Sequence, residues 1–259
     1  MLNDITPVVL TYNEQPNIAR TLAALHWAKE IIVVDSDSTD QTRQLVRADP
    51  RTRLFERPFT THRDQWEYAL HATRIGTGWV LALDADYVLT EAFGHELEQW
   101  APAEDVGGYE VSFRYCVHGA PLRSGAYPPV TVLYRQTEAH YEADGHAHRV
   151  RIRGRVLKLS QPILHDDRKS LQHWLGAQTR YMALEADKLT STPAAELSWL
   201  DRVRKLIVVA PVAMFIYCLI VKGGLLDGRP GLYYALQRSA AELILSLNLV
   251  ERMLTPDAT

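Results

Sequence analysis

Two aspartates one residue apart, Asp84 and Asp86, follow a short apolar stretch at residues 79–83. Carboxylates with this spacing at the end of a buried strand can bind a hard divalent cation such as Mg²⁺ or Mn²⁺. A cation there would hold a diphosphate and neutralise the charge that develops on it as a leaving group. The alternative is a solvated acidic turn, because two aspartates at this spacing also occur together by chance.

A second acidic cluster lies at residues 35–40 (DSDSTD), directly after the apolar stretch 31–34. An acid at the end of a strand can accept hydrogen bonds from a ribose or from the edge of a base. Ser38 or Thr39 would instead serve as the N-cap of the next helix. Capping explains one hydroxyl, but it does not explain acids at three of the six positions.

The first ninety residues alternate between apolar strand patterns and amphipathic helix patterns. This order predicts an α/β fold of the Rossmann-like type, a mostly parallel sheet with helices on both faces. In such sheets ligands bind beyond the carboxyl ends of the strands, so residues 11–14, 35–37 and 84–86 should meet at one edge. The expected strands are residues 5–10, 31–34, 53–56 and 79–83, and the expected helices follow at 18–25, 39–48 and 63–74.

The rest of the chain shows a different pattern. Residues 109–115 and 130–135 have strand character, and residues 150–159 alternate on both sides of Gly154, which predicts a hairpin. Ser170 is placed as the N-cap of a long helix. The later run 206–221 has no charge, but it is shorter than the ~20 residues that span a bilayer, and Pro211 is expected to bend or break a helix there.

Composition excludes several classes of protein. Hydrophobic residues make up 47% and charged residues 23% of the chain, as in ordinary globular proteins. A net charge of −3 argues against nucleic acid as a partner, because phosphate binding needs a basic surface. The two cysteines match neither a disulfide framework nor a zinc site. The first residues lack the basic and long apolar regions of a signal peptide, so export is not expected.

Three motifs in order resemble the inverting glycosyltransferases of family 2, which have the GT-A fold. They are residues 9–14 (VLTYNE), 33–40 (VVDSDSTD) and 83–86 (LDAD). Residues 162–165 (PILH) and 223–228 (GGLLDG) are similar to the branch that builds lipopolysaccharide cores and other surface glycans. The resemblance implies a GT-A catalytic domain at residues 1–168, a helical membrane-associated region at 169–259, and transfer from a nucleotide-sugar, a UDP-sugar, to a glycan or glycolipid acceptor.

The same resemblance implies roles for individual residues. It places the metal, Mg²⁺ or Mn²⁺, at Asp86 and His165, with Asp84 beside it on the nucleotide-sugar, and imidazole is an acceptable ligand for manganese. On the nucleotide side it implies a pocket lined by Thr11, Tyr12, Glu14, Asp35, Asp37, Arg63 and Gln65.

The catalytic base is expected in the loop at residues 144–148 (DGHAH). An inverting transfer needs a carboxylate or an imidazole to take the proton of the acceptor hydroxyl. Many relatives carry His-Glu here, but no glutamate follows His146, so Asp144 is the first candidate and His146 the second. Tyr87 is another departure, because relatives often have an acid directly after the aspartate pair.

Cations flank the apolar run 206–221 on both sides and would favour anionic lipid headgroups. The run therefore predicts a shallow or re-entrant insertion, and residues 231–253 predict an interfacial helix. With an acceptor built on lipid, this implies a location at the cytoplasmic face of a bacterial inner membrane. The flanking cations are Arg202, Arg204, Lys205, Lys222 and Arg229.

Three other functions compete with this interpretation. A nicotinamide-dependent oxidoreductase would need a GxGxxG turn after the first strand, and the chain lacks it. A sugar nucleotidyltransferase would carry a glycine-rich, basic loop there, where this chain has residues 11–14 (TYNE). A non-catalytic, membrane-bound carbohydrate-binding protein would not need the acids at positions 35, 84 and 86.

Overall fold

The computed structural model describes residues 2–125, 127–144 and 147–255, and the side chains of 143, 144 and 147–149 are left aside. The chain forms two units. One comprises Met1–Cys116 and Ala126–Arg168, here the α/β unit, and the other comprises Val117–Gly125 and Lys169–Thr259, here the helical unit. The expected domain boundary after residue 168 stays a prediction. The structure adds that the short segment Val117–Gly125 groups with the helical unit.

The main sheet of the α/β unit has seven strands in the order β12-β6-β9-β4-β1-β2-β3. Strands β4, β1, β2 and β3 run parallel, and β9 runs antiparallel between β4 and β6. The expected mixed α/β fold with a mainly parallel sheet is therefore confirmed. The strands are β1 (Ile5–Thr11), β2 (Ile31–Asp35), β3 (Thr52–Glu56), β4 (Trp79–Asp84), β6 (Val106–Val111), β9 (Val130–Arg135) and β12 (Arg155–Lys158).

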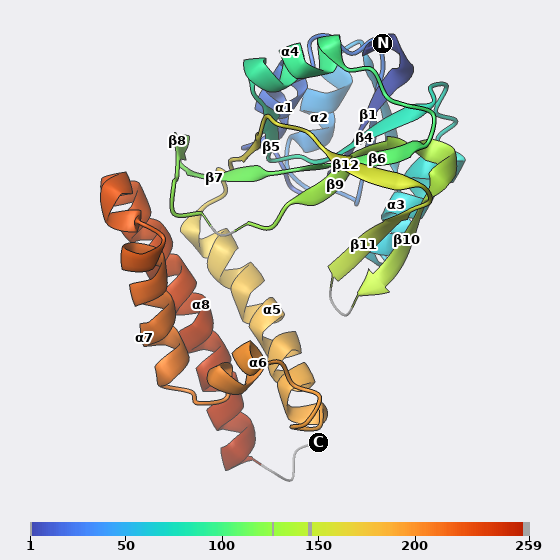
Figure 1. The fold of residues 1–259 in the computed structure, drawn as a ribbon. Helices are drawn as coiled ribbons and strands as arrows, with labels where there is room; N and C mark the ends of the chain where they lie inside the picture. The colour runs from blue at the N-terminus through green and yellow to red at the C-terminus, as the bar shows by residue number, and fades with distance from the viewer. Residues whose placement is uncertain (1, 126, 145–146, 256–259) are drawn as a thin grey trace. The chain divides into compact units, whose positions relative to one another are not determined.

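Helices cover both faces of this sheet (Figure 1). On one face α1 (Ile18–Ala24), α2 (Thr42–Ala48) and α4 (Glu91–Gln99) pack on residues such as Val9, Val33 and Leu83. On the other face α3 (His62–Ala72) packs with its Trp66 and Leu70 on the alternate strand residues. Because β1, β2 and β4 are buried on both faces, they carry continuous apolar runs and no alternating pattern.

Two smaller sheets complete the α/β unit. In one, β13 (Ile163–His165) lies between β5 (Tyr87–Leu89) and β7 (Phe113–Val117). In the other, β10 (Ala139–Asp144) pairs antiparallel with β11 (Ala147–Ile152). The short 3₁₀ turns η1 (Leu2–Asp4) and η2 (Gln136–Glu138) precede β1 and β10.

The predicted hairpin at residues 150–159 is wrong. Gly154 does turn the chain, with φ of +91°, but the strands on its two sides do not pair with each other. β11 pairs antiparallel with the preceding strand β10, and β12 pairs in parallel with β6. The turn before β12 comes close to β6 at Gly107. A side chain at this position would not fit, because a Cβ there would lie 2.1 Å from the carbonyl oxygen of Arg153. The expected single strand at 109–115 is also wrong, because it divides into β6 and β7, which belong to different sheets.

The helical unit is built from α5 (Leu171–Ser191), α6 (Trp199–Arg204), α7 (Val209–Ile216) and α8 (Gly228–Leu254). Figure 1 shows α8 running beside both α5 and α7. The oxygen of Ser170 accepts a hydrogen bond from the backbone N–H of His173, so the expected N-cap is confirmed. A one-turn π-helix η3 (Tyr217–Val221), a 3₁₀ turn η4 (Gly224–Asp227) and the short strand β8 (Ala120–Pro121) complete it.

Helix interruption in this unit occurs before the expected position. Pro211 lies in the first turn of α7, where a missing N–H is tolerated, so the prediction that it breaks the helix is wrong. The break lies at Ile207, which has φ of +57°, an uncommon backbone conformation for a β-branched residue. Among the described residues no single helix is long and apolar enough to cross a bilayer, whereas one pair, Val209–Val221 and Gly224–Leu254, meets that test together with a bend of 67°.

Candidate functional site

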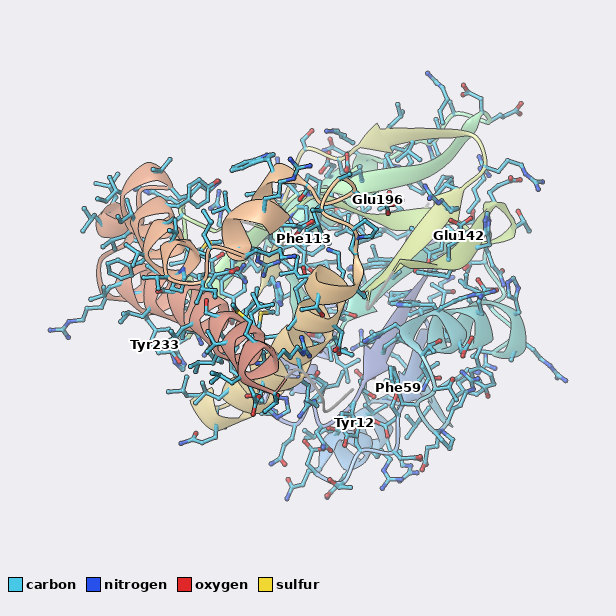
Figure 2. The ribbon with its side chains drawn as sticks, turned by 90° about the horizontal axis from the view of Figure 1, so that it is seen from below. Tyr12, Phe59, Phe113, Glu142, Glu196 and Tyr233 are labelled. Carbon is cyan, nitrogen blue, oxygen red and sulfur yellow. The ribbon has the colours of Figure 1, made fainter. Side chains whose placement is uncertain are left out.

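The three clusters predicted to meet at one sheet edge do so. Strand β1 lies between β2 and β4, with Thr11 opposite Asp35 and Leu10 opposite Asp84. All three strands run in the same direction, so their carboxyl ends and the loops that follow them share one edge. The loop residue Tyr12 has 54% of its surface exposed there (Figure 2).

Asp35 is completely buried and joins two of these loops. Its carboxylate accepts hydrogen bonds from Thr11 Oγ1 at 2.7 Å, from the backbone N–H of Ser38 at 2.8 Å and from Ser38 Oγ at 2.6 Å. A buried carboxylate needs such donors, because an unpaired one would be costly. The structure therefore gives Asp35 and Thr11 a loop-holding role, and their contact with a nucleotide stays a prediction.

The loop after β1 is fixed by hydrogen bonds to the loop after β2. Asn13 and Asp37 both adopt left-handed backbone conformations, with φ of +53° and +60°, which these two residue types tolerate better than most. The backbone N–H of Asn13 donates to Ser38 Oγ at 2.8 Å, and that of Glu14 donates to Thr42 Oγ1 at 2.7 Å. The turns place the side chain of Asp37 in solvent and that of Glu14 at the surface, where a ligand can reach them.

The two α3 residues predicted to line the nucleotide pocket, Arg63 and Gln65, differ in burial. Arg63 is exposed in the first turn, whereas Gln65 is buried. The amide nitrogen of Gln65 donates to Ser36 Oγ at 2.9 Å, and its oxygen accepts from Arg57 Nη1 at 2.8 Å. Gln65 thus holds the loop after β2 through Ser36, and Arg63 carries its charge into solvent.

Asp86 and His165 are eighty residues apart in the chain and in contact in the structure. Asp86 Oδ2 lies 3.1 Å from His165 Nε2, and the two side chains are 13% and 17% exposed. Pairing of β13 with β5 sets His165 opposite Tyr87, and the backbone N–H of Asp166 donates to the carbonyl of Asp86 at 2.9 Å. The structure therefore brings the two predicted metal ligands together, with Asp84 two residues away.

The electrostatics of this cluster favour an added positive charge. Burial, reinforced by the charge of Asp86, raises the pKa of Asp84 above its usual 3.8. Burial also opposes the charged form of His165, but Asp86 outweighs it, so the net effect raises the pKa of His165 above 6.5. Two crowded carboxylates thus stabilise a neighbouring cation.

The residues present fit a cation that is held partly by a substrate. Among the described residues, no group of three or more His, Cys, Asp or Glu side chains is arranged as a complete metal site. Mg²⁺ bound with a phosphate substrate takes only one or two protein carboxylates and keeps several waters, so a complete protein cage is not required. His165 Nδ1 is buried and has no hydrogen-bond partner among the described residues, which leaves Nε2 as the nitrogen directed at Asp86.

Three tyrosines that the sequence did not single out as a group surround His165. The ring centroids of Tyr87, Tyr115 and Tyr127 lie 5.3, 5.1 and 4.8 Å from that of the imidazole, all at steep angles. Strand register explains two of them, because Tyr87 and Tyr115 are the neighbours of His165 on β5 and β7. Tyr127 comes from the segment before β9, which has no periodic pattern to reveal it.

The chain leaving β13 is fixed by a separate polar network. Arg20 Nη1 lies 2.5 Å from Asp166 Oδ2, and the amide of Asn17 donates to both Glu14 and Asp167 at 2.8 Å. Asn17 is completely buried, so this network ties the loop after β1 to the end of β13. The loop after β1 and the His165 side of the edge are therefore held together.

The two candidates for the catalytic base are not tested. Asp144 is the last residue of β10, but its side chain lies outside the part of the chain that the structure describes. His146 lies wholly outside the described residues. Both assignments therefore stay predictions.

Known proteins resemble this chain in sequence and in fold. The lipopolysaccharide core biosynthesis glycosyltransferase LpsC of Rhizobium meliloti (strain 1021) is 28% identical over 115 residues, which span 42% of each chain. S. aureus TarS 1-349 in complex with UDP-GlcNAc superposes with a TM-score of 0.49 at 13% identity, covering 98% of this chain and 92% of that one. Glucosyl-3-phosphoglycerate synthase from Mycobacterium tuberculosis, in complex with Mn²⁺, UDP and glucosyl-3-phosphoglycerate, superposes with a TM-score of 0.44 at 15% sequence identity. The superposition covers 74% of this chain and 82% of that one.

A family model describes the greater part of the α/β unit. The model named Glycosyl transferase family 2 matches residues 7–145, which is more than half of the chain. The match includes the ends of β1, β2 and β4, so it contains the motifs at residues 9–14, 33–40 and 83–86 with their strand-end acids. The chain therefore belongs to glycosyl transferase family 2.

Proposed function

We propose that this protein transfers a sugar from a nucleoside diphosphate, in the first place UDP, to a glycan or glycolipid acceptor, with inversion at the anomeric carbon. The observation that carries the proposal is the Asp86–His165 pair beside Asp84 at the carboxyl edge of the sheet. Membership in glycosyl transferase family 2 supports it. The mainly parallel sheet and its strand-end site agree with the GT-A arrangement expected from the sequence.

Different residues at the sheet edge bind different parts of the donor. Tyr12, Asp37 and Arg63 present exposed groups to the nucleoside, while Asp35 and Gln65 hold their loops in place. Asp84 and Asp86, with His165, face the diphosphate. A divalent cation, Mg²⁺ or Mn²⁺, bound at Asp86 and His165 would neutralise charge on the leaving nucleoside diphosphate.

The acceptor hydroxyl attacks the anomeric carbon as the bond to the diphosphate oxygen breaks on the opposite face. Asp144, or His146 in its place, takes the hydroxyl proton. A base positioned for this transfer raises the rate by about 10²–10⁴-fold. The nucleoside diphosphate leaves with the electron pair of the broken bond, so atoms and charge balance without a further reactant.

The acceptor that we propose is a lipid-linked or lipopolysaccharide-type glycan at the cytoplasmic face of a bacterial inner membrane. The similarity to LpsC, which is named for lipopolysaccharide core biosynthesis, supports this class of acceptor over the matched 115 residues. A glycan carried on lipid requires the enzyme to work close to a bilayer.

Features of the helical unit support a membrane surface as its partner. Many of its large apolar side chains are exposed, including Val221, Leu225 and Leu226 near the bend between η3 and α8. Lys222 and Arg229 flank this bend, and cations in such positions attract anionic lipid headgroups. The bent pair of helices suits a shallow insertion better than an upright span.

A donor screen tests the proposal. Purified full-length protein is incubated with UDP-, GDP- and ADP-sugars and Mn²⁺, and release of nucleoside diphosphate is measured with and without EDTA. We expect slow hydrolysis of one donor class, strongest for UDP, and its loss with the chelator.

Two outcomes would contradict it. Release of pyrophosphate from a nucleoside triphosphate and a sugar 1-phosphate would identify a nucleotidyltransferase. Binding of glycans without turnover of any donor, before and after addition of a lipopolysaccharide-type acceptor, would identify a carbohydrate-binding protein.

A further inference from the structure

We propose that Tyr127 is a positioning residue of the candidate active site, acting on His165 through its ring and on the neighbouring aspartates through a hydroxyl pair with Tyr87. The inference rests on the proposed function, since it concerns the same site. Its evidence is a different set of contacts, which come from the segment before β9 and from β5.

The ring contacts replace the usual hydrogen bond that orients a histidine. A metal-binding histidine normally donates its second ring nitrogen to a carboxylate, carbonyl or water, which fixes the ring. The Nδ1 of His165 is buried, and no group among the described residues hydrogen-bonds it. Apart from the contact of Nε2 with Asp86, the ring is therefore held by packing, and the Tyr127 ring, with its centroid at 4.8 Å, is the nearest of the three surrounding aromatic rings.

The rings of Tyr87, Tyr115 and Tyr127 around His165 are here called the cage, and a fourth aromatic ring supports it. Phe113 on β7 lies between Tyr87 and Tyr127, with ring centroids 4.6 and 5.1 Å away. Tyr87 is buried by its place on β5, so Tyr127 is the one ring of the cage that a loop segment supplies.

The hydroxyl groups of Tyr127 and Tyr87 form a pair that lies near the aspartates. Tyr127 Oη lies 2.7 Å from Tyr87 Oη, and Tyr87 directly follows Asp86 in the chain, three residues after Asp84. A phenol has one proton, so a Tyr87 hydroxyl that donates to a neighbouring carboxylate leaves Tyr127 as the donor within the pair. In this way the hydroxyl of Tyr127 would hold that of Tyr87 in place beside the aspartates.

Two substitutions separate the ring from the hydroxyl. Tyr127→Phe keeps the ring, so we expect Mn²⁺ affinity, measured by electron paramagnetic resonance, to stay at the wild-type value. Its kcat/KM for the donor should fall about 10-fold, because the support of the aspartates is lost. Tyr127→Leu removes both effects, and we expect about 10-fold weaker Mn²⁺ binding together with a fall in kcat/KM of about 100-fold.

The α/β unit supplies a matched control. Tyr134 and Tyr141 form a second buried hydroxyl pair, 2.9 Å apart, in the core under α3. Tyr134→Phe removes an equivalent hydroxyl, and we expect unchanged kcat/KM and Mn²⁺ affinity. If Tyr127→Phe and Tyr127→Leu lowered only the melting temperature and left kcat/KM and Mn²⁺ affinity at the wild-type values, the positioning role would be overturned.

The proposed function and this inference can fail separately. Absence of donor turnover and of Mn²⁺ binding in the wild-type protein would refute the function. The cage is then tested by the histidine ring signals of the full-length protein in NMR. We expect one sharp set for His165 in the wild type and in Tyr134→Phe, and a broadened or split set in Tyr127→Leu. Identical sharp signals in all three proteins would overturn the inference.

Discussion

The α/β unit and the helical unit distribute charge and apolar surface in opposite ways. The α/β unit buries its aliphatic side chains around the sheet and places its acids at a strand edge. The helical unit has a smaller aliphatic core and also buries a charged cluster, in which Arg204 bonds Glu185 at 2.9 Å and Glu242 at 2.9 and 3.0 Å. Of the large apolar side chains exposed in the described residues, all but Tyr12, Phe59, Val156 and Leu157 belong to the helical unit.

This contrast separates two tasks. A soluble protein rarely exposes a large continuous apolar patch, and when it does the patch is usually an interaction site. Chemistry in this protein should therefore depend on the acids of the α/β unit, and attachment to lipid should depend on the exposed surface of the helical unit. Substitutions in one unit should leave the task of the other unchanged.

The largest expected effect is on chemistry. Asp86→Asn removes a charge without changing side-chain volume, so we expect donor turnover to fall by about 10³-fold or more with the fold intact. Turnover is measured with Mn²⁺, folding by circular dichroism, and lipid binding by sedimentation with anionic liposomes. Wild-type turnover in this variant, or turnover of the wild type that ignores EDTA, would refute the metal role.

The next largest effect concerns the charged cluster that joins α5, α6 and α8. Arg204→Met removes the cation that Glu242 and Glu185 share, while Glu185 keeps its contact with Lys188 at 3.3 Å. The loss should destabilise the helical unit by roughly 3 kcal/mol. Chemical denaturation measures the free energy of unfolding, and hydrogen exchange shows which helices lose stability. Arg202→Met is the control, since Arg202 is exposed on the same helix. Equal stability of the two variants would show that the cluster contributes nothing specific.

The base assignment predicts a smaller loss of turnover. Asp144→Asn should lower kcat by about 10²-fold while leaving donor affinity near the wild-type value. Acceptor-dependent transfer and donor binding are measured separately. An unchanged kcat here, combined with a collapse in His146→Ala, would move the role of base to His146.

Lipid attachment should depend on the bend of the helical unit. Leu225 and Leu226 are 65% and 75% exposed, and replacing both with Gln should weaken binding to anionic liposomes by about 10-fold or more. Donor hydrolysis should not change. The control replaces Val156 and Leu157 of β12, exposed apolar residues of the α/β unit, with Gln. If the wild type ignored liposomes, or if both double variants bound equally, the membrane proposal would fail.

The smallest expected effect is pH-dependent and local to the helical unit. Burial opposes ionisation of Asp227, but backbone N–H groups of Ser124 and Arg123 outweigh it and hold the pKa of this carboxyl below 3.8. A lowered folded-state pKa contributes stability above the unfolded pKa and loses it as pH falls through the folded value.

Asp227→Asn should therefore speed amide exchange of residues 123 and 124 at pH 6, by an amount corresponding to roughly 1 kcal/mol. The difference from wild type should shrink below about pH 4. A difference that stayed constant across this range would show that the charge of Asp227 is not responsible.

Local patterns made much of the α/β unit predictable. Strands β1, β2 and β4 are continuous apolar runs, which is why they could be recognised from the sequence. The hairpin at residues 150–159 was mispredicted because alternation and a glycine specify a turn but not a partner strand. The partner strand is set by tertiary packing, in which Gly107 of β6 leaves room for the backbone of Arg153 in the turn before β12.

The sequence by itself determined which residue types end the central strands, and the direction of parallel strands then required those ends to share an edge. It did not determine that Asp35 and Gln65 are buried braces while Tyr12 and Arg63 are exposed, because burial depends on how the loops fold over one another. The resemblance implied that Asp86 and His165 lie together, but no local pattern indicated their contact or the approach of Tyr127. Those contacts join segments some forty to eighty residues apart, and only strand pairing in the folded chain brings them together.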